Sequence, residues 1–226
     1  KTSFAEAILY KAGAISRTGK REDKNTVMDF DDEEKKRLIS IGTSVASCEW
    51  DGVKLNLIDT PGDFDFLGEV VQALRVADCG IVVIEAKEGV TVGAEKAVRF
   101  LQRQDIPFAF FVNKLEDPGA DFQKTMVDIR NHFGRDTTVM MLPFKENGEY
   151  AGYVDVLNRK SYHYVDGVRE ECETPENMKA DAELQFANLK EQVAESSDEL
   201  MMKYFDDEEF TDEELRAGLK DRMSGG

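Results

Sequence analysis

The sequence predicts an α/β fold with a doubly wound, mostly parallel sheet and a second, small α+β unit. Residues 80–84 and 106–112 are continuous apolar runs of strand length, which is typical of parallel strands buried on both faces. Helical apolar spacing separates these runs, and strand–helix–strand order indicates parallel strands joined by crossover helices. A further strand pattern at residues 53–58 runs into Asp59 and a Pro-Gly turn, at the edge where such sheets bind ligands.

The composition is that of a folded cytoplasmic protein. Its 226 residues, 41% of them hydrophobic, suffice for one sizeable core or for a core with a small additional unit. No apolar run approaches the ~18 residues of a membrane span and no secretory signal pattern opens the chain, so we expect no membrane partner. The net charge of −17 would repel a nucleic-acid backbone and disfavours direct DNA binding.

The cysteines and histidines form no metal-binding pattern. Cys48, Cys79 and Cys172 are odd in number and far apart, which fits neither a disulfide framework nor a CxxC pair. The only histidines are His132 and His163. We therefore expect buried or idle thiols in a reducing compartment rather than a zinc site.

The first part of the chain combines a helix with a long polar segment. Residues 5–12 have the spacing of a helix that packs on a sheet, and residues 14–32 lack periodicity and are expected to form a mobile loop. The charged run 33–37 follows, and two interpretations stay open. It is either a solvated helix end, or a segment that becomes ordered around a phosphate and its metal, with Ser40 as the hydroxyl ligand.

The elements that follow alternate between strands and helices. Residues 45–50 and 53–58 flank Asp51-Gly52, a strong two-residue turn signal, and should form a hairpin that delivers Asp59. The strand 106–112 ends at polar residues, Asn113, Lys114 and Glu116, again at the ligand-binding edge. The remaining expected elements are helices at 68–77, 91–104 and 122–133, and a strand at 139–142.

The character of the sequence changes beyond Pro143. Residues 153–156 and 161–165 resemble short, half-exposed antiparallel strands. A helix should begin with Pro175 at its first position, and residues 211–214 fit a capping box before Leu215. We predict a core domain at residues 1–143 and a subdomain with acidic helices at residues 144–226, whose role is an interaction surface rather than catalysis.

Four short motifs together resemble those of the P-loop GTPases in order and approximate spacing. They are Lys1-Thr2, Ile39-Ser40-Ile41, Asp59-Thr60-Pro61-Gly62 and Asn113-Lys114. The third motif, with Asp65-Phe66, resembles the translational GTPases in particular. Residues 153–222 resemble the subdomain inserted in the GTP-binding domain of elongation factor G, and the chain as a whole looks most similar to elongation factor G-like bacterial paralogues. The resemblance implies a P-loop NTPase sheet carrying a small inserted α+β subdomain.

The resemblance also implies a set of roles for these residues. Lys1 would neutralise the nucleotide's β and γ phosphates, while Asn113 and Lys114 would bind the guanine ring. The Gly62 amide would sense the γ-phosphate. The implied ligands are GTP or GDP and Mg²⁺, with Thr2, Ser40 and Asp59 as the metal ligands.

Two residues depart from the family pattern. Elongation factor G has a histidine after Asp-Thr-Pro-Gly that orients the attacking water, and this chain has Asp63. An ionised carboxylate repels the γ-phosphate and donates no proton, so we expect slow hydrolysis. Glu116 stands where the family reads guanine with an aspartate, and its extra methylene should loosen the pair of bonds to the base.

The resemblance predicts a ribosome-dependent GTPase. In the family a glycine-rich phosphate loop precedes Lys1 and a Ser-Ala loop follows Gly226, so we expect this chain alone to bind nucleotide poorly or not at all. The expected partner is the ribosome, with the acidic subdomain facing basic ribosomal proteins and the chain otherwise monomeric. The alternative is a ribosome-binding module with weak or lapsed hydrolysis, favoured by Asp63 and Glu116. An ATP-using enzyme is disfavoured by Asn113-Lys114.

Overall fold

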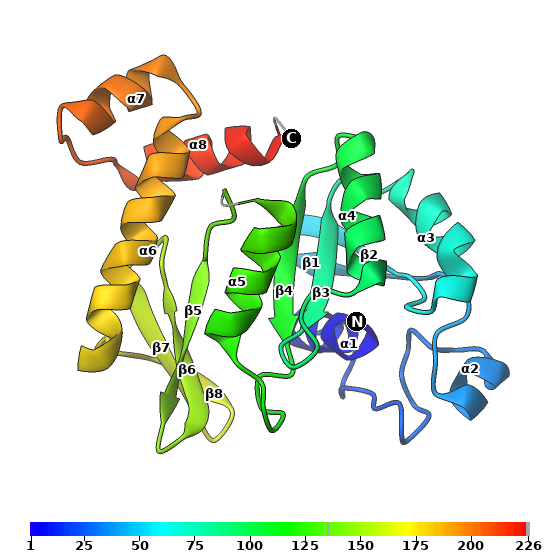
Figure 1. The fold of residues 1–226 in the computed structure, drawn as a ribbon. Coiled ribbons are helices and arrows are strands. Elements are labelled where there is room, and N and C mark those ends of the chain that lie inside the picture. The colour runs from blue at the N-terminus through cyan, green and yellow to red at the C-terminus, as the bar shows by residue number, and fades with distance from the viewer. Residues whose placement is uncertain (135, 225–226) are drawn as a thin grey trace. The chain divides into compact units, whose positions relative to one another are not determined.

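The computed structural model describes residues 1–134 and 136–224 (Figure 1). The chain divides into two compact units, of which the first comprises Lys1–Val83 with Val92–Ala109 and the second Ile84–Thr91 with Phe110–Gly226. Among the described residues, none of the helices combines the length and the apolar character needed to cross a membrane.

An antiparallel hairpin organises the first unit. Strands β1 (Ser44–Trp50) and β2 (Val53–Asp59) pair along their whole length, as the sequence predicts. The turn between them has φ of 49° at Asp51 and 78° at Gly52, which is the conformation that Asp-Gly turns favour. Because Ser44 lies opposite Asp59, the hairpin places Asp59 at the open end, away from its turn.

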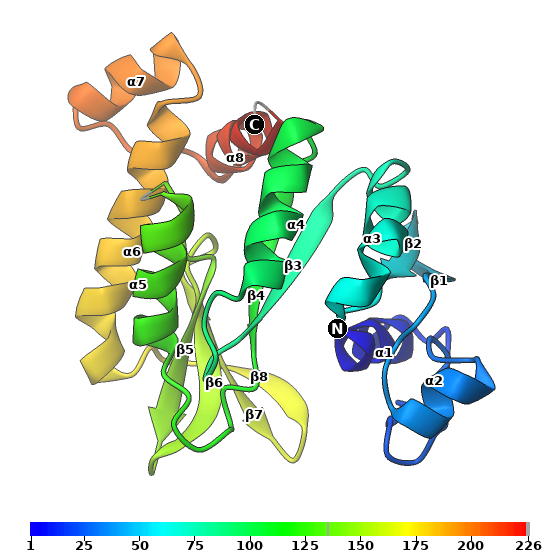
Figure 2. The ribbon, with the colours of Figure 1, turned by 45° about the vertical axis from the view of Figure 1, so that its right-hand side comes forward.

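Helix α1 (Thr2–Lys11) packs on this hairpin, and Figure 2 labels α1, β1 and β2. Leu9 and Met28 are 1% exposed and lie in one apolar cluster with Cys48 of β1. Leu55 and Leu57 of β2 pack against the same cluster. The core of the first unit therefore fixes the start of α1 relative to the end of β2.

The charged run of the sequence forms helix α2 (Asp32–Arg37), which begins with a capping box between Asp31 and Glu34. Glu34 is buried, and its Oε1 accepts hydrogen bonds from the N–H groups of Ile41 (2.8 Å) and Gly42 (3.1 Å). The interpretation as a purely solvated helix end is therefore wrong for Glu34, which ties α2 to the segment containing Ser40.

Strands β3 (Gly80–Glu85) and β4 (Phe108–Asn113) pair with each other, and helix α4 (Val92–Arg103) connects them. The Gly80 N–H bonds to the carbonyl of Pro107, and the Ala86 N–H bonds to that of Asn113, both at 2.9 Å. The acceptor's residue number rises from Pro107 to Asn113 as the donor's rises from Gly80 to Ala86, so the strands are parallel, as predicted. Before β3 lie the 3₁₀ helix η1 (Phe64–Phe66) and helix α3 (Leu67–Leu74).

The predicted burial of β3 on both faces is wrong. Gly80, Val82 and Ile84 are buried, whereas Ile81 on the opposite face of the pleat is 49% exposed. The buried face packs closely on α4: a Cβ added to Gly80 would lie 2.7 Å from Cδ2 of Leu101. An apolar run alone predicts neither how many faces of a strand are covered nor which.

An antiparallel sheet forms part of the second unit. Its four strands are hydrogen-bonded in chain order: β5 (Met141–Glu146), β6 (Glu149–Asp155), β7 (Lys160–Val165) and β8 (Val168–Cys172). The strand expected at 139–142 begins two residues later, at Met141, and continues through Pro143, which pairs with Tyr153 of β6. Strand β8 was not predicted, because its three central residues are charged and four of its five residues are exposed, so no apolar alternation marks it.

Four helices complete the second unit: α5 (Phe122–Phe133), α6 (Glu176–Ala194), α7 (Asp198–Phe205) and α8 (Asp212–Ser224). Leu189 and Val193 of α6 form a buried cluster with Leu215 of α8. The predicted capping box exists: Thr211 N–H donates to Glu214 and Glu214 N–H donates back to the Thr211 hydroxyl. Pro175 is the N-cap of α6 rather than its first residue, and α7 was not predicted.

Candidate functional site

The three predicted metal ligands lie together in the first unit. Asp59 ends β2 and Thr2 begins α1, and they are 7% and 1% exposed. The Thr2 hydroxyl donates to Oδ2 of Asp59 at 2.6 Å, and the Ser40 hydroxyl oxygen lies 3.3 Å from that of Thr2. The core described above thus brings together three oxygen-bearing side chains that are far apart in the sequence.

Two residues that the sequence analysis missed complete this cluster. The Arg21 Nη2 donates to the hydroxyl oxygens of Thr2 (2.8 Å) and Ser40 (2.7 Å), while its Nε donates to Oδ2 of Asp29 (3.0 Å). The Ser40 hydroxyl donates to Oδ1 of Asp29 at 2.6 Å. Both residues come from the aperiodic loop 14–31, where no pattern distinguishes one charged side chain from another.

Lys1 reaches the other side of the same strand end. Its Nζ donates to the carbonyls of Thr60 (2.8 Å) and Pro61 (2.7 Å), and lies 3.3 Å from where a Cβ on Gly62 would be. Desolvation lowers the pKa of the Lys1 ammonium, and the Asp59 charge partly offsets this. The predicted phosphate-binding lysine and the predicted phosphate-sensing glycine are therefore neighbours.

The electrostatics of Asp59 favour a nearby cation. Burial raises the pKa of its carboxyl group, while the hydrogen bond from Thr2 and the charge of Lys1 act in the opposite direction. A buried carboxylate whose ionised form is disfavoured is stabilised by any cation that approaches it.

The donor set fits Mg²⁺. Thr2, Ser40 and Asp59 offer only oxygen atoms, which are the ligands that this hard cation prefers. Within residues 1–134 and 136–224, no group of three or more His, Cys, Asp or Glu side chains could hold a metal ion. A metal at this cluster would therefore depend on hydroxyl oxygens and on groups supplied by a ligand.

Asp63 lies just beyond this cluster and is exposed. Its Oδ1 accepts a hydrogen bond from the Asp65 N–H at 3.3 Å, at the start of η1. The carboxylate thus caps a short turn. The catalytic positions expected at Gly62 and Asp63 stay predictions.

The expected base-binding residues lie in the second unit. Asn113 ends β4, and Lys114 follows with φ of 58°. Nζ of Lys114 forms an ion pair with Oε1 of Glu85 at 2.8 Å, and this hydrogen bond raises the pKa of the lysine. Glu116 is exposed. Glu85, at the end of β3, was missed because a single acid after a strand is no motif.

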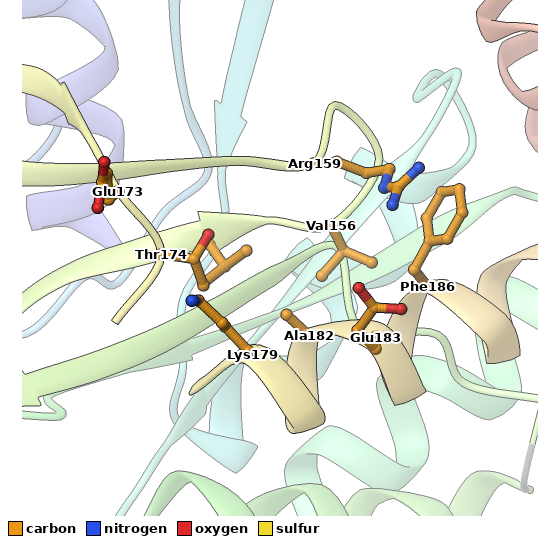
Figure 3. Close-up of a pocket in the computed structure, with 9 residues that line it drawn as sticks. Val156, Arg159, Glu173, Thr174, Lys179, Ala182, Glu183 and Phe186 are labelled. Carbon is orange, nitrogen blue, oxygen red and sulfur yellow. The ribbon is translucent and has the colours of Figure 1, made fainter. Parts of the chain in front are cut away.

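The second unit also contains a cavity of about 490 Å³, shown in Figure 3. It lies between the end of β6, the turn that follows it, the segment after β8 and one face of α6. The guanidinium of Arg159 stacks over the Phe186 ring at 4.8 Å. None of the predicted site residues lines it. The lining residues are Val154, Val156, Arg159, Glu173, Thr174, Lys179, Ala182, Glu183 and Phe186.

Comparisons with known proteins agree with the motifs. The protein family described as "Elongation factor Tu GTP binding domain" matches residues 1–216. Elongation factor G of Mycoplasma genitalium is 36% identical over 210 residues, which cover 91% of this chain and 30% of that protein. A crystal structure of a Thermus thermophilus protein superposes with a TM-score of 0.94 at 33% identity, over 100% of this chain and 34% of that one. The chain thus spans about a third of the length of these relatives.

Proposed function

We start from the fact that the chain belongs to the family of elongation factor Tu GTP-binding domains, and we propose that it binds GTP and GDP with Mg²⁺ and hydrolyses GTP within an elongation factor G-like translation factor. The observation that carries the proposal is the meeting of Thr2, Ser40 and Asp59 beside Lys1. Oxygen ligands for Mg²⁺ next to a phosphate-binding ammonium are what a nucleoside triphosphate site requires.

Each candidate residue of the first unit has a separate proposed role in such a site. The Lys1 ammonium, held by two carbonyls beside Gly62, is in place to bind phosphate oxygens. Thr2 and Ser40 would contribute hydroxyl oxygens to the metal, and Asp59 would hold its shell. Bound Mg²⁺ would neutralise charge on the phosphates. Catalysis in sites of this kind is mostly positioning and charge stabilisation, which these rigid, buried groups favour.

Guanine selection is assigned to the second unit. Asn113 ends β4 and Lys114 follows it, and the Lys114 ammonium is held by its ion pair with Glu85. Glu116 would accept from the base edge with less suitable geometry than an aspartate. We expect a preference for guanine with reduced discrimination.

The ribosome is the proposed partner, because the curated relative is an elongation factor. Helices α6 to α8 are rich in acidic residues, so residues 144–226 are the proposed contact with basic ribosomal proteins, and residues 1–143 the nucleotide-binding core. A monomer working in the cytoplasm, where ribosomes translate, completes the proposal.

Ribosome-stimulated hydrolysis by the complete polypeptide tests this function. We expect GTP turnover that rises on adding ribosomes and falls in Thr2→Ala, which removes a proposed metal ligand. Ribosome binding without any GTP turnover would instead support the alternative, a module whose hydrolysis has lapsed. If the complete polypeptide neither hydrolysed GTP nor bound ribosomes, that result would contradict both the GTPase and the alternative.

A further inference from the structure

The Arg21 guanidinium lies on the two hydroxyl oxygens that the proposed metal would need. Its Nη2 is 2.8 Å from Oγ1 of Thr2 and 2.7 Å from Oγ of Ser40. Both distances are those of good hydrogen bonds, with the arginine as the donor. A single nitrogen therefore bridges the side chains from α1 and from the segment after α2.

The protons of the two hydroxyls leave both oxygens as acceptors towards Arg21. The Thr2 hydroxyl donates its proton to Asp59, and the Ser40 hydroxyl donates its proton to Asp29. Each oxygen then has its two lone pairs left, and Arg21 takes one of them on each. A metal ion would use the same oxygens, and the guanidinium charge at 2.7–2.8 Å from them repels a second cation there, so Arg21 and a metal compete at close range.

The position of Arg21 is fixed rather than accidental. Its Nε forms an ion pair with Asp29 at 3.0 Å, and the Asp29 side chain is 5% exposed. The Arg21 side chain is 32% exposed, so part of it contacts solvent. The site thus contains a cation that is held by a buried acid at one edge of the cluster.

We propose that Arg21 competes with Mg²⁺ for the Thr2 and Ser40 hydroxyls and thereby sets the Mg²⁺ dependence of nucleotide binding. The inference rests on the proposed function, since it concerns the same metal site. Mg²⁺ binding displaces Nη2 from both oxygens. The guanidinium then either retains its ion pair with Asp29 or turns towards solvent. The protein consequently holds Mg²⁺ and nucleotide less tightly than the oxygen ligands alone would allow.

Three variants of the complete polypeptide test this competition. Arg21→Ala removes the charge and both hydrogen bonds, and Arg21→Lys keeps the charge but cannot retain the same bridge and the Asp29 contact together. Arg17→Ala is the matched control, because Arg17 is an exposed arginine on the same loop. The readout is the Mg²⁺ concentration that gives half-maximal binding of a fluorescent GDP analogue.

We expect Arg21→Ala to lower that Mg²⁺ concentration about tenfold, which corresponds to the loss of one charge-assisted hydrogen bond as a competitor. The half-maximal Mg²⁺ concentration of Arg21→Lys should lie between those of Arg21→Ala and the wild type, and that of Arg17→Ala should equal the wild-type value. Structural damage would weaken Mg²⁺ binding, so a gain distinguishes competition from disruption. An unchanged or higher Mg²⁺ requirement in both Arg21 variants would overturn the inference.

Thermal unfolding supplies a second readout that needs no turnover. In EDTA, Arg21→Ala should melt below the wild type, and saturating Mg²⁺ with GDP should narrow the gap, because Arg21 no longer binds the hydroxyls there. If Arg21→Ala lowered the melting temperature equally in EDTA and in Mg²⁺ with GDP, the role of Arg21 would be purely structural and the competition would be refuted. If GDP binding by the wild-type protein needed no Mg²⁺, the proposed metal site itself would be contradicted. If all variants instead depended on Mg²⁺ equally, only the competition by Arg21 would be contradicted.

Discussion

Asp63 is the residue on which the expected rate depends most. The structure places it exposed beside the Lys1–Gly62 contact, with its carboxylate capping the turn into η1. A carboxylate near a γ-phosphate raises the barrier through like-charge repulsion, and an ionised one has no proton to donate. Because the side chain only caps a turn, it should be replaceable without disturbing the fold.

Asp63→His should therefore accelerate single-turnover GTP hydrolysis on ribosomes. We expect about a tenfold gain or more, since a positioned donor typically contributes roughly 10²–10⁴-fold and part of that will be lost to imperfect placement. Asp65→His is the control, because Asp65 is exposed and lies two residues away, in the short helix η1 that Asp63 caps. A rate for Asp63→His that is unchanged, or lower than that of the wild type, would count against the assigned position.

At the scale of elements, α1 orders the polar loop that follows it. Glu6 is 0% exposed, and its carboxylate accepts hydrogen bonds from the N–H groups of Gly19, Val27 and Met28. Gly19 must be glycine in this arrangement, since an added Cβ would lie 2.6 Å from Cα of Thr26. Helix α1 thereby positions the loop that carries Arg21 and Asp29.

Glu6→Gln should loosen that loop while leaving the hairpin intact. One amide oxygen cannot replace both carboxylate oxygens, so buried N–H groups lose their partner at a cost of about 1–3 kcal/mol each. Hydrogen exchange at Gly19, Val27 and Met28 should accelerate by about tenfold to a hundredfold. Glu22→Gln, at an exposed position of the same loop, should leave exchange unchanged. Equal protection in Glu6→Gln and the wild type would contradict this role.

How far the sequence predicts each element depends on how local its signals are. The β1–β2 hairpin is confirmed because Asp51-Gly52 and alternating side chains act within a few residues. The capping box of α8 is confirmed for the same reason. The exposed face of β3, by contrast, depends on what packs against it, and no local pattern contains that information.

In the candidate site, too, residues with a local signal could be predicted and residues that depend on long-range contacts could not. Asp59, Asn113 and Lys114 could be named as candidates because they stand at the carboxyl ends of strands, where α/β sheets place their functional groups. Arg21 and Asp29 were missed because their role comes from long-range contacts made through Glu6 and Ser40. Only the folded chain brings an aperiodic loop onto the start of α1.

For the molecule as a whole, the proposed function divides nucleotide recognition between two compact units. The proposed phosphate and metal ligands belong to the first, and the proposed base-binding residues Asn113, Lys114 and Glu116 belong to the second. The proposed function therefore makes a claim about each unit separately: Mg²⁺ dependence reports on Thr2, Ser40 and Asp59, and base selectivity reports on the residues after β4.

One competition experiment on the complete polypeptide tests both claims together. Fluorescent GDP is bound in the presence of Mg²⁺ and displaced with GTP, ATP or XTP, and the titration is repeated in EDTA. We predict that GTP displaces it at lower concentration than ATP or XTP, and that GDP affinity falls when EDTA removes the metal. Equal displacement by all three nucleotides, with the same affinity in EDTA, would contradict the assignment of a magnesium-dependent guanine-nucleotide site.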